Sequence, residues 1–354
     1  MTISLNYKVE RNPIINIIID GVIVDRVLFI GDPHIGRRFT TGVPSHRIGD
    51  REEFLFSTFK RLLNPTDPLI TKIVIVGDLF DKFIVNPTYV YDTYEVFKQV
   101  SDKIDVYLIP GNHDLSKDVT KKSSFQLLTI TVSGLDNIHV IEKNESHTIE
   151  YDGWDLHFYF DCYNPFEDCN VEPGLLARLK STGPLISVGH WDSLSILDKG
   201  YIPTQDLLNL SDVVVSGHEH TYREYEYPFD KQKNKVLFTG SMQPYSHAED
   251  PDSEIYMTIK EADLVKYDAA KSFQYKCLRI ECSPLFVLTE SIDCFALTHK
   301  VIEEVKKETE IETEQVDVNN YNQTLLTWVE SKKDLTESVK QELSELLKTK
   351  GYLS

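Results

Sequence analysis

The sequence has few features that would stabilise a small secreted protein or anchor a protein in a membrane. Its five cysteines are odd in number and form no C-x-x-C pair, so we expect reduced thiols rather than a disulfide framework. No stretch approaches 18 uninterrupted apolar residues, and the N-terminus lacks a basic region followed by an apolar core. We therefore expect a cytoplasmic protein with no membrane association.

The sequence also lacks the basic surplus that is usual in nucleic-acid-binding proteins. It carries 37 Lys and Arg against 56 Asp and Glu, a formal net charge of -19. Phosphate contacts supply most of the affinity in such proteins, so a nucleic-acid substrate would require local basic patches, bound metals or a basic partner. The length of 354 residues, 41% of them hydrophobic, suits one large α/β domain with smaller appendages.

Short apolar stretches predict β-strands, and most of them stop where a polar cluster begins. The stretch from Ile14 to Ile30 predicts a hairpin around Asp20-Gly21, and residues 51–63 and 89–100 predict helices. Continuously apolar strands are typical of a sheet covered on both faces, with ligands at the carboxyl ends of the strands. The predicted strands are 27–30, 73–76, 106–109, 185–188, 213–215 and 236–239.

Five clusters of metal-ligand residues lie at or just after these strands. Any one of them alone is explained more simply by turn formation or helix capping. Together they nearly complete a ligand set for two divalent metals, a device for attacking phosphate esters. The clusters are Asp32-Pro33-His34, Gly77-Asp78-Leu79-Phe80-Asp81, Gly111-Asn112-His113-Asp114, Gly189-His190 and Gly217-His218-Glu219-His220.

The residue types indicate different chemical roles for the residues within the clusters. Two adjacent cations need a ligand that bridges them, and the carboxylate of Asp78 is the natural candidate. A mixture of Asp, His and Asn suits Mn, Fe or Zn better than Ca or Mg, and the absence of cysteine argues against structural zinc. His113 follows the candidate ligand Asn112, so we expect it to donate a proton to the leaving oxygen, with Asp114 as its orienting carboxylate.

On these motifs the chain resembles the calcineurin-like binuclear metallophosphoesterases, whose signatures D-x-H, G-D-x-x-D, G-N-H-D, G-H and G-H-x-H occur in order within residues 27–245. The resemblance implies a four-layer α/β fold, with two mixed sheets sandwiched between helices. It implies that Asp78 bridges the metals and that His113 is catalytic rather than a ligand. The implied ligands are Asp32, His34 and His220 for the first metal, and Asn112, His190 and His218 for the second.

Within that superfamily the chain looks most like the SbcD-type double-strand-break repair nucleases, particularly the short phage versions. The supporting stretches are 77–81, 110–115, 188–191, 216–221 and 239–241. This resemblance implies a Mn-dependent exonuclease and endonuclease for DNA recombination, replication and repair. It also implies an SMC-like ATPase partner of the SbcC type, a homodimer within a heterotetramer, and the host cytoplasm as the location if a phage encodes it.

The chain departs from that family in two places. Many relatives have a histidine where this chain has Asp81, so His113 would carry more of the acid chemistry. The family also has a capping domain that reads DNA, whereas residues 286–318 leave room for only a reduced one. How the protein would grip DNA is therefore open at this stage.

The C-terminal part predicts two further regions after a nuclease domain at 1–285. Residues 286–318 would form the reduced capping region and an acidic linker. Residues 319–354 would form a small helical extension that docks on the ATPase, although these helices could instead pack on the chain's own body. One amphipathic stripe consists of Leu325, Leu326 and Val329, and the other of Val339, Leu343, Leu346 and Leu347.

Four arginines flank the first metal loop and are candidate contacts to DNA phosphates: Arg37, Arg38, Arg47 and Arg51. The alternative is a solvated loop with incidental charge. Two rival functions remain for the whole chain. A free-standing phosphodiesterase or phosphatase for small molecules would use the same seven ligands. A non-catalytic scaffold is the other rival, but such proteins have typically lost ligands, and none is missing here.

Overall fold

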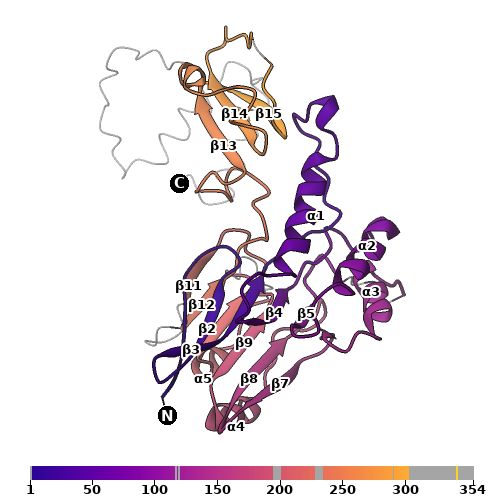
Figure 1. Ribbon diagram of the computed structural model, residues 1–354, viewed down its shortest axis with the longest axis vertical. Helices are drawn as coiled ribbons and strands as arrows, with labels where there is room; N and C mark the ends of the chain where they lie inside the picture. The colour runs from indigo at the N-terminus through magenta and orange to yellow at the C-terminus, as the bar shows by residue number, and fades with distance from the viewer. Residues whose placement is uncertain are drawn as a thin grey trace. The chain divides into compact units, whose positions relative to one another are not determined.

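The computed structural model describes residues 2–115, 118, 120–193, 201–227, 234–289, 291–302 and 340–341. The chain divides into two compact units, Met1–Ile302 and Glu303–Ser354. Almost all of the described residues belong to the first unit, which contains three β-sheets (Figure 1). Among the described residues, no helix combines the length and the apolar character needed to cross a membrane.

The first sheet has six strands in the order β1-β2-β3-β4-β5-β6. The antiparallel β2–β3 hairpin turns at Asp20 and Gly21, both of which have positive φ. From β3 to β6 the pairing is parallel, so the carboxyl ends of β3, β4 and β5 lie at one edge. The strands are β1 Ile3–Tyr7, β2 Ile14–Ile19, β3 Val22–Ile30, β4 Ile70–Val76, β5 Asp105–Ile109 and β6 Ile138–Val140.

The second sheet also has six strands, in the order β11-β12-β10-β9-β8-β7. Its four central strands are parallel, and β7 and β11 pair antiparallel at its two edges. The strands are β7 Glu145–Tyr151, β8 Trp154–Asp161, β9 Leu185–Gly189, β10 Val213–Ser216, β11 Arg223–Tyr227 and β12 Asn234–Phe238.

The two sheets face each other across an apolar core and carry helices on their outer faces (Figure 1). Alternate residues of β4 show the arrangement, because Val74 and Val76 point into the core between the sheets while Ile73 and Ile75 pack against the first helical layer. This confirms the predicted four-layer α/β architecture. The helices are α1 Asp50–Leu62, α2 Pro87–Phe97, α3 Ser124–Val132, α4 Pro173–Thr182 and α5 Gln205–Leu210, with 3₁₀ turns at Ser45–Arg47 and Glu261–Lys266.

A third sheet of three parallel strands follows the two-sheet body along the chain. It consists of β13 Tyr256–Lys260, β14 Cys277–Cys282 and β15 Ala296–Val301. One face of this sheet has its own small core, in which Leu278 and Ile280 are buried. The predicted boundary at residue 285 falls between β14 and β15, within this one sheet.

The predicted C-terminal helix pair at 319–354 lies outside the described residues, apart from residues 340–341. The domain division and the docking role of that segment therefore remain predictions. The strands predicted at 27–30, 73–76, 106–109, 185–188 and 213–215 all fall within observed strands. The helices predicted at 51–63 and 89–100 correspond to α1 and α2, with ends shifted by one to three residues.

Candidate metal centre

The five clusters converge at the carboxyl ends of β3, β4, β5, β9 and β10. Asp32, His34, Asp78 and His218 all adopt positive φ, at 40°, 46°, 48° and 72°. Residues other than glycine, asparagine and aspartate rarely adopt this conformation, so the cost, on the order of 1–3 kcal/mol, applies above all to His34 and His218. The loops are thus bent in a way that only the surrounding structure can maintain, which is typical of functional sites.

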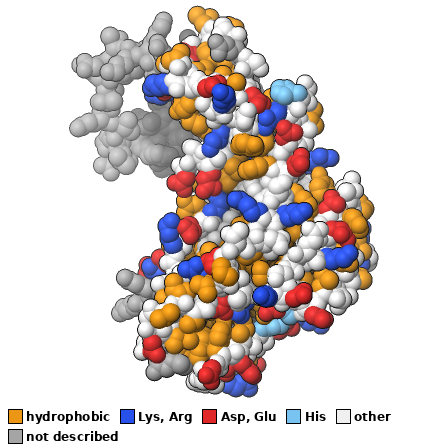
Figure 2. Space-filling model, viewed as in Figure 1, with side chains coloured by type: hydrophobic (Ala, Val, Ile, Leu, Met, Phe, Trp, Pro, Cys, Tyr) orange, Lys and Arg blue, Asp and Glu red, His pale blue; other side chains and the backbone are white. Residues whose placement is uncertain are grey.

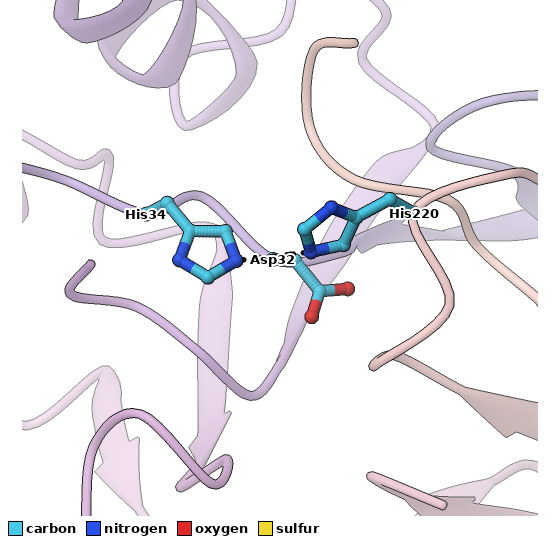
Figure 3. Close-up of side chains that lie close together, drawn as sticks. All are labelled: Asp32, His34 and His220. Atoms are coloured by element: carbon cyan, nitrogen blue, oxygen red, sulfur yellow. Dashed lines mark hydrogen bonds between the residues drawn. The ribbon is translucent and has the colours of Figure 1, made fainter. Parts of the chain in front are cut away.

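Asp32, His34 and His220 form the first group of candidate ligands (Figure 3). The loops after β3 and β10 bring the two imidazoles together edge to face, with ring planes 75° apart and Nε2 of His34 lying 3.1 Å from Nε2 of His220. Asp32 is fully buried beside them, and its two oxygens accept the backbone N–H of His218 at 3.0 and 3.1 Å. The three side chains predicted for the first metal are therefore in mutual reach.

Asp78 lies between the two groups, as a bridging ligand should. Its Oδ2 is 3.8 Å from Nε2 of His34 and 3.5 Å from Nε2 of His190, while its Oδ1 accepts the backbone N–H of His113 at 2.8 Å. Burial works to raise the pKa of Asp78, but the neighbouring imidazoles, His190 foremost, outweigh it and hold that pKa below its usual value. The carboxylate is therefore ionised and available to cations.

Asn112, His190 and His218 form the second group. Oδ1 of Asn112 lies 3.0 Å from both Nε2 of His190 and Nδ1 of His218. Nδ1 of His190 donates to the carbonyl of Val76 at 2.8 Å, which leaves the lone pair on Nε2 directed at the other ligands. The structure thus brings together all seven side chains predicted to hold two metals.

The chemistry of these donors fits divalent cations. Nδ1 of His34 is buried without a hydrogen-bond partner, and burial lowers the pKa of His34 to about 3, so the ring is neutral. Burial, and then the charge of Asp78, raise the pKa of Asp32. Within the described residues no Lys or Arg forms an ion pair with Asp32 or Asp78. Asp32 and Asp78 therefore lie close together beside the neutral ring of His34, and two bound dications would supply positive charge to balance them.

His113 lies at the mouth of this centre and is exposed. Its Nδ1 donates to the backbone carbonyl of Asp81 at 2.6 Å, so Nε2 is the nitrogen left to meet a substrate. Nitrogen atoms of His113 and His34 and an oxygen of Asp78 also lie within 4.8 Å of one another. The geometry is compatible with the predicted proton donor, and this grouping is the reason to test whether His113 is instead a ligand.

Asp114 has a different set of partners from the one predicted. Its buried carboxylate accepts the backbone N–H groups of Leu79, Phe80 and Gly111 at 3.0–3.1 Å, and no hydrogen bond to the imidazole of His113 is found among the described residues. Burial and the charge of Asp78 raise the pKa of Asp114 to about 8. Asp114 therefore joins the loop after β4 to the loop after β5 instead of orienting His113.

Asp81, where many relatives have histidine, contacts two side chains of the first metal loop. Its Oδ1 lies 3.4 Å from Nη1 of Arg37 and 3.6 Å from Nδ1 of His34. Its backbone carbonyl, as noted, accepts from His113. Asp81 thus positions a candidate ligand, a candidate DNA contact and the candidate proton donor.

The four flanking arginines separate into two pairs. Arg51 is buried, donates to Gln243 and to the carbonyl of Pro244, and lies 4.5 Å over the ring of Phe39. Arg47 pairs with Asp50 and Asp293 at 2.8 Å, so its guanidinium already has protein partners. The side chain of Arg38 is 67% exposed, and that of Arg37 is 31% exposed. Of these four arginines, only Arg37 and Arg38 present their guanidinium groups toward solvent.

Three further residues contact the candidate ligands and were not predicted from the sequence. Asp192 forms an ion pair with Nε2 of His218, and this carboxylate outweighs burial to raise the pKa of His218. Glu249 lies 3.5 Å from Nδ1 of His220. The hydroxyl of Tyr245 donates to the carbonyls of Asp32 and Pro33, and its ring packs on His34 and His220. The position of Asp192, two residues after His190, was the one available hint.

Comparison with known proteins agrees with this geometry. A DNA double-strand break repair protein Mre11 from Methanocaldococcus jannaschii is 27% identical over 117 residues, which cover 32% of this chain and 30% of that protein. The chain thus matches less than a third of that relative's length. The calcineurin-like phosphoesterase family matches residues 25–222, more than half of the 354 residues and all five clusters. The chain belongs to the calcineurin-like phosphoesterases, metal-dependent hydrolases of phosphate esters.

Proposed function

We propose that this protein is a Mn-dependent DNA nuclease with exonuclease and endonuclease activity, the nuclease subunit of an SbcCD-like recombination and repair complex. The observation that carries the proposal is the convergence of seven ligand side chains, an exposed histidine and exposed arginines at one edge of the two sheets. The similarity to an Mre11 repair protein supports DNA as the substrate.

Asp32, His34 and His220 would hold one metal, Asn112, His190 and His218 the other, and Asp78 would bridge them. Such a pair lowers the pKa of a water molecule and neutralises charge on the phosphate oxygens. The oxygen and nitrogen donors fit Mn, which we propose as the working metal.

The chain's own residues would handle the proton that the leaving oxygen needs. Because Nδ1 of His113 is held by the carbonyl of Asp81, Nε2 is the nitrogen that can deliver that proton when the ring is protonated. The backbone N–H of His113 donates to Asp78, which keeps the ring at a constant position relative to the bridging carboxylate.

The acidic net charge is compatible with a DNA substrate if a partner supplies much of the binding surface. We propose an SMC-like ATPase of the SbcC type, docked through residues 319–354, as that partner. DNA contact by this chain itself is assigned to Arg37 and Arg38, whose guanidinium groups are more exposed than those of Arg47 and Arg51.

The proposed homodimer has a candidate surface on helices α2 and α3. Three large apolar side chains of these helices and one from the segment just before α2 are exposed, and an apolar cavity of about 670 Å³ lies among them. Figure 2 shows hydrophobic side chains along the edge where these helices lie. The exposed residues are Ile84, Tyr91, Leu127 and Ile130. Substituting Ile130 with Glu should shift the sedimentation of a dimer to that of a monomer, and an unchanged mass would rule out this surface.

The substrate proposal is tested with the purified chain, Mn²⁺ and two substrates. We expect cleavage of single- and double-stranded oligonucleotides, as well as of bis(p-nitrophenyl) phosphate, and stimulation of DNA cleavage by the ATPase partner with ATP. Hydrolysis of the small ester with no cleavage of DNA in either condition would favour the free-standing phosphodiesterase. Deleting residues 319–354 should abolish co-purification with the ATPase.

A further inference from the structure

A cavity of about 290 Å³ opens beside the first-metal side of the centre. One wall is the loop 37–41 that follows His34, and a second is the segment 245–247. The third wall is a face of the sheet β13-β14-β15. In that sheet Arg279 of β14 pairs in register with Thr258 and Thr298, so these three side chains share one face.

The lining of this cavity contains only positive charges. Arg37, Arg38 and Arg279 line it, and none of its lining residues is Asp or Glu. The chain as a whole carries 56 acids against 37 bases, so an acid-free cavity with three arginines is a marked local reversal. Two of these arginines form ion pairs with acidic residues that are not part of the lining. Asp81 lies 3.4 Å from Arg37, and Glu52 lies 3.9 Å from Arg38.

The other cavity next to the metal centre shows that this charge pattern is not general. It has a volume of about 600 Å³ and reaches Tyr163, whose ring lies 6.5 Å from that of His190. Its lining mixes both signs: Lys121, Lys122 and Lys143 with Asp118, Glu142, Glu167 and Asp168. The two cavities therefore flank opposite metal groups, and only the one on the side of His34 and His220 is electrically suited to a polyanion.

The hydrogen-bond donors of the arginine-lined cavity suit phosphate oxygens. Arg38 and Arg279 come from different walls, and Thr40, Thr41 and Thr298 are also among the lining residues. Among the described residues Arg279 forms no ion pair. Glu281, two residues further along β14, is near enough that Lys300 and, more weakly, Arg279 lower its pKa. No described carboxylate forms an ion pair with Arg279, however, so this guanidinium on a concave surface is available to an anionic ligand.

The cavity and the metal centre share a wall. Arg37 lies 4.5 Å over the ring of Tyr245, and that ring is 5.3 Å from the ring of His34 and 5.5 Å from that of His220. A strand whose scissile phosphate lies at the metals would therefore pass a neighbouring phosphate over Tyr245 into the arginine-lined cavity. Figure 2 shows Lys and Arg side chains across the middle of the drawn face, with acidic side chains beside some of them.

We propose that this cavity is a second anion site, which binds a non-scissile phosphate of the nucleic-acid strand between Arg38 on the first metal loop and Arg279 on β14. The inference rests on the proposed nuclease function and assigns a role in substrate binding to the sheet β13-β14-β15. It makes the enzyme favour a polymer over any ester that carries a single phosphate.

The experiment compares an oligonucleotide with bis(p-nitrophenyl) phosphate, which has no second phosphate. In Arg279→Gln, the ratio of kcat/KM for the oligonucleotide to kcat/KM for the small ester should fall by about tenfold or more, because a charge-assisted hydrogen bond to phosphate is lost. The dependence of log KM on log salt concentration should become shallower by about one. Arg279→Lys should recover part of the ratio. Arg178→Gln, on the exposed face of α4, makes the same charge change away from the cavity and serves as the control.

Each outcome decides one question. A ratio and a salt dependence equal to those of the wild type would overturn the second anion site, and so would an equal loss on both substrates, because that would place Arg279 in the chemistry or the folding. If the wild-type enzyme hydrolyses the small ester but cleaves no oligonucleotide, the nuclease function itself fails, whatever the variants do.

Discussion

The metal centre has a floor and a rim that are held in different ways. The floor consists of Asp32, His34, Asp78 and His190, whose side chains are at most 3% exposed. The rim consists of Asn112, His218 and His220, and the two histidine side chains are 33% and 26% exposed. Backbone groups and burial position the floor, whereas the carboxylates of Asp192 and Glu249 orient the rim histidines. Floor substitutions should therefore remove the centre, and rim substitutions should adjust it.

The largest effect is expected from the floor. Asp78→Asn removes the charge of the carboxylate predicted to bridge the two metal groups, so both metals should be lost and hydrolysis should fall to background. Metal content after dialysis against Mn²⁺, measured by mass spectrometry, checks this. Asp152→Asn, an exposed position in a turn, makes the same charge change and should keep both metals. Retention of one metal by the Asp78 variant would show that it does not bridge.

His113 lies at the mouth of the centre, outside the floor and the rim, and is proposed to donate a proton to the leaving oxygen. His113→Ala should keep both metals and lower turnover by about 10²- to 10⁴-fold, as expected for the loss of a general acid. Metal content and kcat are measured on the same preparation. Loss of one metal in this variant would make His113 a ligand and extend the metal site to the outer edge of the centre.

A smaller effect is expected from Asp192, which holds a rim ligand. Asp192→Asn removes the carboxylate from Nε2 of His218, so Mn²⁺ affinity at one of two sites should fall by about 10- to 100-fold. Titration calorimetry resolves the two sites, and Glu249→Gln should weaken the other one. If Asp192→Asn lowers only the melting temperature, with both affinities unchanged, its role is in folding alone.

The smallest effect is expected from Tyr245, beneath the first metal loop. Tyr245→Phe removes the hydroxyl that donates to the carbonyls of Asp32 and Pro33 at 2.8 and 2.7 Å. The free energy of unfolding should fall by about 1–2 kcal/mol, measured by urea unfolding, while the ring still packs on His34 and His220. Turnover should change by less than about tenfold, which a kcat measurement checks. A larger loss would place the Tyr245 hydroxyl in the chemistry.

The parts of this structure that the sequence predicts are those with a local signal. The apolar run Ile73–Val76 predicts β4 and its end at Gly77, and Asp20-Gly21 predicts the first hairpin. The order of the clusters then predicts that their side chains meet, because parallel strands end at the same edge of a sheet.

What could not be predicted depends on contacts between distant segments. Asp114 follows His113 directly, which suggested that the two side chains interact, but its carboxylate instead meets the amides of Leu79 and Phe80, 35 and 34 residues away. The strand β15 carries polar residues at Thr298, His299 and Lys300, so its apolar pattern is weak. The contribution of β14 to the arginine-lined cavity is visible only after the sheet has formed.

The candidate ligands come from two separate halves of the two-sheet body. The strands of residues 3–140 present Asp32, His34, Asp78 and Asn112, and those of residues 145–238 present the other three. Neither half supplies all the candidate ligands of either metal, so bound cations would link the two halves where the sheets meet. By linkage, binding at a thousandfold excess over Kd adds about 4 kcal/mol to the stability of the joined state. Chelation should thus lower the free energy of unfolding as well as stop hydrolysis, so the stability of the association between the two halves would depend on the metal concentration.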